Sequence, residues 1–259
     1  MASDLPWAVV TGASGGLGEA LARDLAQRGY NLVLVSRGQA AMDRIATELR
    51  ARCPVQIVVE PVDLSAAGSA ALLCARLEQG GIAPAMLINN AAFGISEDFI
   101  RHDAERLRAM LQLDIVTLTE LTLLLGRQMA RAGRGHIMLI ASVAAFQPTP
   151  SLAAYSAGKA YVLSLGEALN VELAGKVVVT VLSPGLMDTG FNAASGFETP
   201  TMLRRTILTP AEVAAIGLDA MFSGKSGVVA GRWNQIATFI GRFFSRHFLA
   251  TSARRMAGK

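Results

Sequence analysis

A tyrosine and a lysine four residues apart, Tyr155 and Lys159, are the side chains best suited to proton transfer in this sequence. On a helix, residues at i and i+4 share one face, so the phenol and the ammonium would lie side by side. The positive charge would stabilise the phenolate and lower the pKa of Tyr155, giving a usable proton donor or acceptor. The same spacing is common on helix surfaces, so the upstream residues decide between these interpretations.

Ser142 stands 13 residues before Tyr155, at the end of an expected strand over residues 135–141. The loop to the next expected helix, residues 153–173, is long enough to bring the serine hydroxyl beside the phenol. These residues therefore predict one site. Ser142 would hydrogen-bond a carbonyl oxygen, and Tyr155 would give that oxygen a proton as hydride arrives at carbon. Lys159 would lower the pKa of the tyrosine and bind the nicotinamide ribose.

A glycine-rich turn follows the first apolar run of the chain, residues 7–10. The turn contains Gly12, Gly16 and Gly18, and a helical pattern follows it as far as Gly29. Glycines permit a tight turn and close approach to a pyrophosphate, and a helix N-terminus offers free N–H groups to that anion. Between the first strand and the first helix of an α/β chain, this turn predicts a dinucleotide site. The alternative is a tight turn without a ligand.

The second expected strand, residues 31–35, ends in Ser36 and Arg37 instead of an acidic residue. In dinucleotide-binding folds an acid here binds the ribose 2′-hydroxyl, whereas a hydroxyl and a guanidinium suit a 2′-phosphate. We therefore expect NADP(H) in preference to NAD(H), with Arg37 as the discriminating charge. The alternative is a solvated surface arginine.

Polar residues also follow the third and fourth expected strands. Asp63 comes after residues 55–59, at the edge where doubly wound sheets bind their ligands. It either accepts a hydrogen bond from the adenine amino group or caps a helix that begins near Ser65. Asn89 and Asn90 end the fourth strand, where their amides can tie adjacent strands together and border the cofactor ribose.

Length and composition indicate one large intracellular α/β domain. The 259 residues include only two cysteines, Cys53 and Cys74, which predict neither a disulfide framework nor a metal site. The N-terminus lacks a signal-peptide pattern, and no apolar run of about 18 residues predicts a membrane span, so we expect a cytoplasmic protein. Residues 220–259 hold seven basic and no acidic residues, leaving 17 basic against 20 acidic in residues 1–219. Without a basic stripe on the body, nucleic-acid binding is not expected.

Taken together, these motifs resemble those of the short-chain dehydrogenase/reductase family, in family order and near family spacing. The matching motifs are Thr11-Gly12-x-x-x-Gly16-x-Gly18, Asp63, Asn89-Asn90-Ala91, Ser142, Tyr155-x-x-x-Lys159 and Pro184-Gly185-x-x-x-Thr189. The resemblance implies a seven-stranded parallel Rossmann-like sheet in a single domain and an oligomer, a homodimer or homotetramer. It also implies cofactor contacts from Pro184, Gly185 and Thr189. With the residues of the preceding paragraphs, the expected cofactor contacts are Gly12, Ser14, Gly16, Leu17, Gly18, Ser36, Arg37, Asp63, Leu64, Asn90, Ala91, Tyr155, Lys159, Pro184, Gly185 and Thr189.

Two residues depart from the family pattern. Ala92 follows Asn90-Ala91 where the family has glycine, an extra methyl group that we expect to be tolerated. Asp114, in a long apolar helix expected over residues 103–130, takes the place of the asparagine that completes the family's proton relay. An ionised aspartate would add a negative charge near Lys159. The relay survives if its water is held by the backbone carbonyl, and turnover falls if the amide is needed.

The segment after the sixth expected strand divides into a loop and a tail. We expect residues 1–231 to form the domain, with a substrate loop over about 186–209 whose apolar residues suggest an apolar substrate. Residues 232–259 predict a basic amphipathic helix. It would pack against protein, close a substrate pocket, contact another subunit, or lie on an anionic membrane surface.

The leading hypothesis is an NADPH-dependent carbonyl reductase, or an alcohol dehydrogenase in the reverse direction, acting on a small-molecule carbonyl or alcohol. One alternative is a lipid-directed reductase that the tail recruits to membranes. The other is a sensor or scaffold that binds NADP(H) with weak catalysis, for which Asp114 is the only support.

Overall fold

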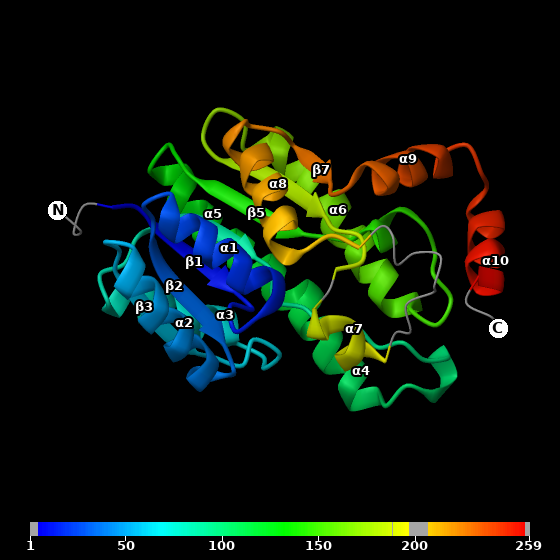
Figure 1. The fold of residues 1–259 in the computed structure, drawn as a ribbon, viewed down its shortest axis with the longest axis horizontal. Coiled ribbons are helices and arrows are strands. Elements are labelled where there is room, and N and C mark those ends of the chain that lie inside the picture. The colour runs from blue at the N-terminus through cyan, green and yellow to red at the C-terminus, as the bar shows by residue number, and fades with distance from the viewer. Residues whose placement is uncertain (1–4, 188, 197–206, 257–259) are drawn as a thin grey trace.

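A seven-stranded parallel sheet forms the centre of the computed structural model, which describes residues 5–187, 189–196 and 207–256 (Figure 1). The strand order is β3-β2-β1-β4-β5-β6-β7. The order reverses at β1, which pairs with both β2 and β4, and such a switch point is where open α/β sheets bind ligands. The strands are β1 (Trp7–Thr11), β2 (Asn31–Ser36), β3 (Ile57–Pro61), β4 (Pro84–Asn89), β5 (His136–Ile140), β6 (Val178–Ser183) and β7 (Gly227–Val229). This sheet confirms the expected fold class.

Helices cover both faces of the sheet, and each face has its own apolar core. The first core packs α1 (Gly16–Gln27), α2 (Gln39–Arg52) and α8 (Pro210–Phe222) against alternate strand residues. The second packs α3 (Ser69–Gln79), α5 (Leu118–Arg131) and α6 (Ala153–Glu172) against the opposite face. Because both faces are covered, the central strands are continuous apolar runs.

The long helix expected over residues 103–130 is interrupted. It consists of α4 (Ala104–Leu111), a π-helical segment (Gln112–Thr117) and α5, and Asp103 caps its start by accepting the Arg106 N–H at 2.8 Å. The stretch Ala104–Arg131 is long and apolar enough to cross a membrane by composition, with a mean hydropathy of 1.4. A single such helix is weak evidence for a span, because core helices of other proteins pass the same test; 44% of the apolar window is buried inside the protein.

The expected substrate loop and its surroundings contain short helices. These are α7 (Gly190–Ser195) and the 3-10 segments Phe99–Arg101 and Val143–Phe146. A capping box precedes α8, with the Thr209 hydroxyl accepting the Glu212 N–H and the glutamate accepting in return. Residues 188 and 197–206 of the loop that we expected over residues 186–209, including Phe197, Met202 and Leu203, fall outside the described residues.

The tail forms two helices instead of one. The helices α9 (Arg232–Gly241) and α10 (Arg246–Met256) extend away from the body of the domain beyond β7 (Figure 1). The outer face of α9 is the apolar one, with Trp233 at 68% exposure and Phe239 at 58%. The expected subunit and membrane contacts of this tail stay predictions.

Candidate active site

One cavity of about 1590 Å³ lies at the carboxyl ends of the strands. It extends from the glycine turn after β1, past the ends of β4, β5 and β6, to the tail helices. All of the predicted site residues line this cavity except Gly18 and Asp114, which are considered below. The cavity therefore brings together residues that are more than 200 positions apart in the sequence.

The glycine turn is held in place by β4. Gly12 and Gly16 have φ angles of 67° and 55°, in the left-handed region that favours glycine. A Cβ on Gly12 would lie 2.7 Å from Nδ2 of Asn90, whose amide donates to the Thr11 carbonyl at 2.9 Å. Gly15, the N-cap of α1, faces open space among the described residues. An open helix N-terminus on a glycine-rich turn fits a pyrophosphate.

Gly18 has a different role from the predicted one. It lies outside the cavity wall that the described residues form. A Cβ there would lie 2.1 Å from the Gly12 carbonyl oxygen and 2.7 Å from Nδ2 of Asn90. Gly18 therefore lets the first turn of α1 pack against the β1 turn, and its contribution to a nucleotide site is indirect.

Ser14, Ser36 and Arg37 lie together at the outer end of the cavity. The Ser36 hydroxyl donates to the Ser14 hydroxyl at 2.9 Å. Within the part of the chain that the structure describes, no hydrogen bond occupies the Arg37 guanidinium, which is exposed at the rim. Two hydroxyls and one available cation form a group of donors that suits a phosphate.

Asp63 and Leu64 line the cavity beside Arg37. The Asp63 carboxylate accepts the backbone N–H and the hydroxyl of Ser65, at 3.0 and 2.6 Å. These bonds to Ser65, together with the charge of Arg37, lower the pKa of Asp63. The alternative that Asp63 caps the next helix is wrong, because α3 begins later, at Ser69, with Gly68 as its N-cap.

The two asparagines after β4 divide their tasks. Asn90 holds the glycine turn and lines the cavity together with Ala91. Asn89 is buried, and its amide donates to the Leu118 carbonyl at 3.2 Å and to Thr122 at 2.9 Å. Asn89 thus joins β4 to α5 instead of joining two strands, a correction to the prediction.

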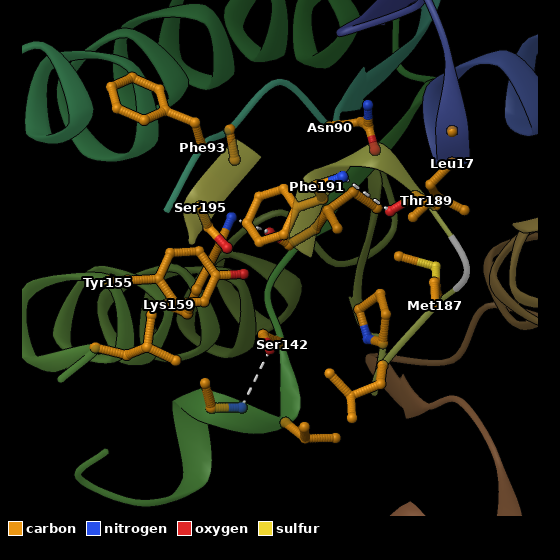
Figure 2. Close-up of a pocket in the computed structure, with 18 of the residues that line it drawn as sticks. Leu17, Asn90, Phe93, Ser142, Tyr155, Lys159, Met187, Thr189, Phe191 and Ser195 are labelled. Atoms are coloured by element: carbon orange, nitrogen blue, oxygen red, sulfur yellow. Dashed lines mark hydrogen bonds between the residues drawn. The ribbon is translucent and has the colours of Figure 1, made fainter. Parts of the chain in front are cut away.

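The three predicted catalytic side chains converge on one wall of the cavity. Ser142 ends β5, and Tyr155 and Lys159 lie on adjacent turns of α6, with the phenol directed into the pocket (Figure 2). The Ser142 oxygen accepts the Ala144 N–H at 3.1 Å. Nζ of Lys159 donates to the Ile140 carbonyl at 3.0 Å, which ties α6 to β5.

The electrostatic environment of Tyr155 differs from the expected one. Burial raises the pKa of the phenol, the negative charge of Asp114 raises it further, and the hydrogen bond with Ser142 lowers it. Nζ of Lys159 lies 5.6 Å from the centre of the Tyr155 ring. The expected lowering of the tyrosine pKa by Lys159 is not found, because desolvation and Asp114 dominate.

Asp114 lies behind this wall, in the π-helical segment, and is 2% exposed. One carboxylate oxygen accepts the Phe93 N–H at 3.2 Å, and the other lies 3.9 Å from Nζ of Lys159. Burial raises the pKa of Asp114 to about 6, against the lowering effects of Lys159 and of the Phe93 N–H. Asp114 therefore acts on the site through charge, without lining the cavity.

The segment after β6 forms the side of the cavity next to the glycine turn, where a Cβ on Gly16 would lie 3.4 Å from Cγ2 of Thr189. Pro184, Gly185 and Thr189 line it, as predicted, and Leu17 faces them from α1. Phe191 lies with its ring centre 5.7 Å from that of Tyr155, so an aromatic surface adjoins the phenol (Figure 2). This contact restricts what can approach the tyrosine hydroxyl from the loop side.

The tail contributes a wall that the predicted site residues did not include. The cavity-facing residues of α9 and α10 are Asn234, Ala237, Thr238, Gly241, Leu249 and Ala253. Small and polar residues at i, i+3, i+4 and i+7 on α9, opposite its aromatic residues, were the sequence signal for this surface. A Cβ on Gly185 would lie 2.2 Å from Nδ2 of Asn234, so glycine at that position lets the tail pack closely.

Among the described residues, no group of three or more His, Cys, Asp or Glu side chains could hold a metal ion. The polarising groups at this site are therefore the hydroxyls and charges already described. Their positions, at strand ends and on one helix face, are set by the fold.

Comparison with known proteins identifies relatives along most of the chain. The family model described as short chain dehydrogenase matches residues 6–198. An uncharacterized oxidoreductase of Staphylococcus epidermidis is 31% identical and covers 81% of this chain and 90% of its own. A very-long-chain 3-oxoacyl-CoA reductase of Anas platyrhynchos is also 31% identical, over 84% of this chain and 71% of its own.

Solved structures share the fold. A short-chain dehydrogenase from Sphingobium yanoikuyae in complex with NADPH is 28% identical, with a TM-score of 0.81 over 92% of this chain and 95% of that chain. A 7beta-hydroxysteroid dehydrogenase is 25% identical, with a TM-score of 0.87 over 97% of this chain and 96% of that chain. A 3-ketoacyl-(acyl-carrier-protein) reductase from Brucella melitensis, complexed with NADH, is also 25% identical, with a TM-score of 0.76 over 87% and 96%.

Proposed function

The chain belongs to the short-chain dehydrogenases, a family of nicotinamide-dependent oxidoreductases, and from that premise we propose that it is an NADPH-dependent carbonyl reductase for bulky apolar ketones. The observation that carries the proposal is the convergence of Ser142, Tyr155 and Lys159 on one wall of a cavity with an apolar far end. The reverse reaction is oxidation of the corresponding alcohol.

The proposed chemistry divides between the cofactor and the protein. A bound nicotinamide supplies the hydride for the carbonyl carbon. Ser142 and Tyr155 donate hydrogen bonds to the carbonyl oxygen, and the phenol gives up its proton as negative charge develops there. Lys159 holds the wall together through Ile140 and places a positive charge near the phenol. A sensor would need a nucleotide site but not these three groups, so we do not favour that alternative.

The preference for NADPH rests on the outer end of the cavity. Ser14, Ser36 and Arg37 would hold the 2′-phosphate, and the open N-terminus of α1 would hold the pyrophosphate. No acidic residue directly follows β2 to bind a free ribose 2′-hydroxyl. Solved relatives with either NADPH or NADH exist, so this preference needs its own measurement.

The apolar substrate is inferred from the side chains around the phenol and at the far end. The apolar residues there are Phe93, Phe146, Leu152, Leu186, Met187, Phe191 and Leu249. Apolar walls with a few convergent polar groups are typical of small-molecule sites. The named relatives act on a long-chain 3-oxoacyl group and on a hydroxysteroid, which share a bulky apolar body with one carbonyl or hydroxyl.

A fluorescence titration with NADPH and NADH tests the cofactor proposal first. We expect NADPH to bind more tightly than NADH to the wild type. Arg37→Ala should weaken NADPH binding by about ten- to a hundredfold, the loss of one charge-assisted contact, and leave NADH binding nearly unchanged. Arg50→Ala, at an arginine on the far side of α2 that bonds the Ile57 carbonyl, is the control. Equal or tighter NADH binding would contradict the proposal.

A carbonyl panel with the preferred cofactor then tests the substrate class. Ketones of increasing apolar bulk should give increasing kcat/KM, and small hydrophilic aldehydes should be poor substrates. Turnover limited to small polar carbonyls would remove the apolar proposal while leaving the reductase intact.

A further inference from the structure

The buried carboxylate of Asp114 carries an inference about proton donation. In the part of the chain that the structure describes, its second oxygen has no hydrogen-bond partner, although it is fully enclosed. The nearest cation, Nζ of Lys159, is 3.9 Å from this oxygen. A buried carboxylate without full hydrogen bonding is costly unless an opposite charge balances it.

Lys159 is likewise a buried charge with few hydrogen bonds. It is 2% exposed, and its ammonium donates to one carbonyl, that of Ile140. Burial lowers the pKa of Lys159, and the charge of Asp114 raises it. Each of the two buried charges therefore favours the ionised form of the other.

Both charges lie near the phenol: Nζ of Lys159 is 5.6 Å from the centre of the Tyr155 ring, and the charge of Asp114 raises the pKa of Tyr155. A lone ammonium near Tyr155 would favour the phenolate, because opposite charges attract strongly where water is excluded. The carboxylate cancels much of that attraction and itself repels a phenolate. Among the described residues, three titratable groups face one another here: Asp114 from the π-helical segment, and Tyr155 and Lys159 from α6. The Phe93 N–H acts on Asp114, and the Ser142 hydroxyl acts on Tyr155.

We propose that Asp114 is a positioning residue that balances the Lys159 ammonium and holds the Tyr155 hydroxyl in its protonated, proton-donating form. An amide has nearly the same shape but no charge. With asparagine at this position, the ammonium would be uncompensated and the tyrosine would lose its proton at lower pH. The aspartate thus extends the pH range in which the site is ready for carbonyl reduction. This proposal rests on the proposed role of Tyr155 as proton donor.

Direct titration of the tyrosine tests the proposal without turnover. The chain has three tyrosines, so protein labelled with 13C at the Cζ position of tyrosine gives three signals, and Tyr155→Phe assigns the relevant one. Asp114→Asn should move the titration midpoint of Tyr155 to lower pH by about one unit or more, a tenfold or greater rise in phenolate at a given pH. The signals of Tyr30 and Tyr161 should not move.

The control is Asp43→Asn, the same chemical change at an exposed position on α2. It should leave all three tyrosine titrations as in the wild type. A Tyr155 midpoint that stays in place or moves to higher pH in Asp114→Asn would overturn the proposal. Because the titration needs no substrate, failure of the reductase assignment would be seen separately, as absence of turnover across the carbonyl panel.

A second variant covers the case in which Asp114→Asn does not fold. Lys159→Met keeps the aspartate and removes its counter-charge. In protein labelled with 13C at aspartate carboxyls, the midpoint of Asp114 should then rise above its wild-type value, since electrostatic coupling is reciprocal. An unchanged midpoint would mean that the two side chains do not balance one another, and would overturn the proposal. Far-UV circular dichroism of each variant verifies the fold.

Discussion

The two ends of the cavity are built in different ways. At the glycine end, the close contacts involve the backbone: a Cβ on Gly12 would collide with Asn90 and Ala91, and one on Gly18 with the Gly12 carbonyl. At the tail end, the wall consists of side chains on α9 and α10, and a Cβ on Gly241 would have Leu249 as its nearest described neighbour, at 3.9 Å. One end is fixed by the path of the chain, whereas the other has room for change.

This difference assigns separate tasks to the two ends. Nucleotide binding needs one backbone geometry, because the pyrophosphate and riboses are common to every substrate of a dehydrogenase. In the proposed function, substrate binding would be adjusted by side chains on α9 and α10, which follow the last strand in the sequence. Between the two ends lie Ser142, which follows β5, and Tyr155 and Lys159 on α6; both elements pack in the second apolar core.

The largest effect is expected between the two ends, at the phenol. Tyr155→Phe should reduce kcat by about a thousandfold, roughly 4 kcal/mol of transition-state stabilisation, because the proton donor is lost. NADPH affinity should be retained, since the phenol contributes little to nucleotide binding. The measurement pairs steady-state kinetics with the fluorescence titration.

Tyr161→Phe is the matched control for that substitution. Tyr161 lies on the same helix, is 39% exposed, and forms a hydrogen bond with Thr119 at 2.9 Å away from the cavity. It should retain nearly full turnover. Comparable losses in both variants would mean that α6 is perturbed as a whole and that the phenol has no special role.

A smaller effect than the loss of kcat in Tyr155→Phe is expected when a methyl group is added to a glycine at the glycine end. Gly18→Ala should lower the free energy of unfolding by about 1–3 kcal/mol, the usual cost of overpacking, because the Gly12 carbonyl cannot move away easily. It should also weaken NADPH binding by displacing the turn. Thermal unfolding and the cofactor titration measure the two losses.

Gly15→Ala tests whether that sensitivity is local. Its φ of 172° is extended backbone that any residue adopts, and a Cβ there has nothing within 4 Å among the described residues. We expect unfolding of the cofactor-free protein to remain close to wild type. If both alanine variants lost the same stability, the backbone-fixed description of this end would be wrong.

The smallest effect is expected at the tail end. Gly241→Leu should fill part of the cavity and reduce kcat/KM for the bulkiest ketones by about tenfold, while NADPH affinity and thermal stability change little. The substitution also replaces glycine by a better helix former. Kinetics on ketones of graded size measure the effect, which should vanish for the smallest ones.

Ile240→Leu, one residue earlier and 48% exposed on the outer face, serves as the control. It should leave the ranking of substrates unchanged. An equal loss for large and small ketones in Gly241→Leu would show that α9 does not border the substrate.

The glycine end and the catalytic wall were predictable because their signals are local. Apolar runs mark the buried strands, and parallel strands place Ser142, Asn90 and Asp63 at one edge of the sheet. Spacing on a helix places Tyr155 beside Lys159. None of these inferences needs knowledge of distant contacts.

The remaining features depend on contacts between distant parts of the chain. The direction of the pKa shift of Tyr155 follows from burial and from Asp114, which a single pair of residues on a helix cannot reveal. The packing role of Gly18 requires the position of the Gly12 carbonyl. Likewise, the inner face of α9 is recognised as a cavity wall only when Asn234 is seen against Gly185.

The position of the tail in the sequence has a consequence for how this enzyme could diversify. The family match ends at residue 198, and α9 and α10 follow the last strand of the sheet. Recombination after β7 would therefore exchange the two helices that we propose to face the substrate, and would leave the proposed nucleotide site and proton donor in place. Chimeras joined in the turn at Gly231 offer a direct route to new substrate ranges on an unchanged catalytic framework.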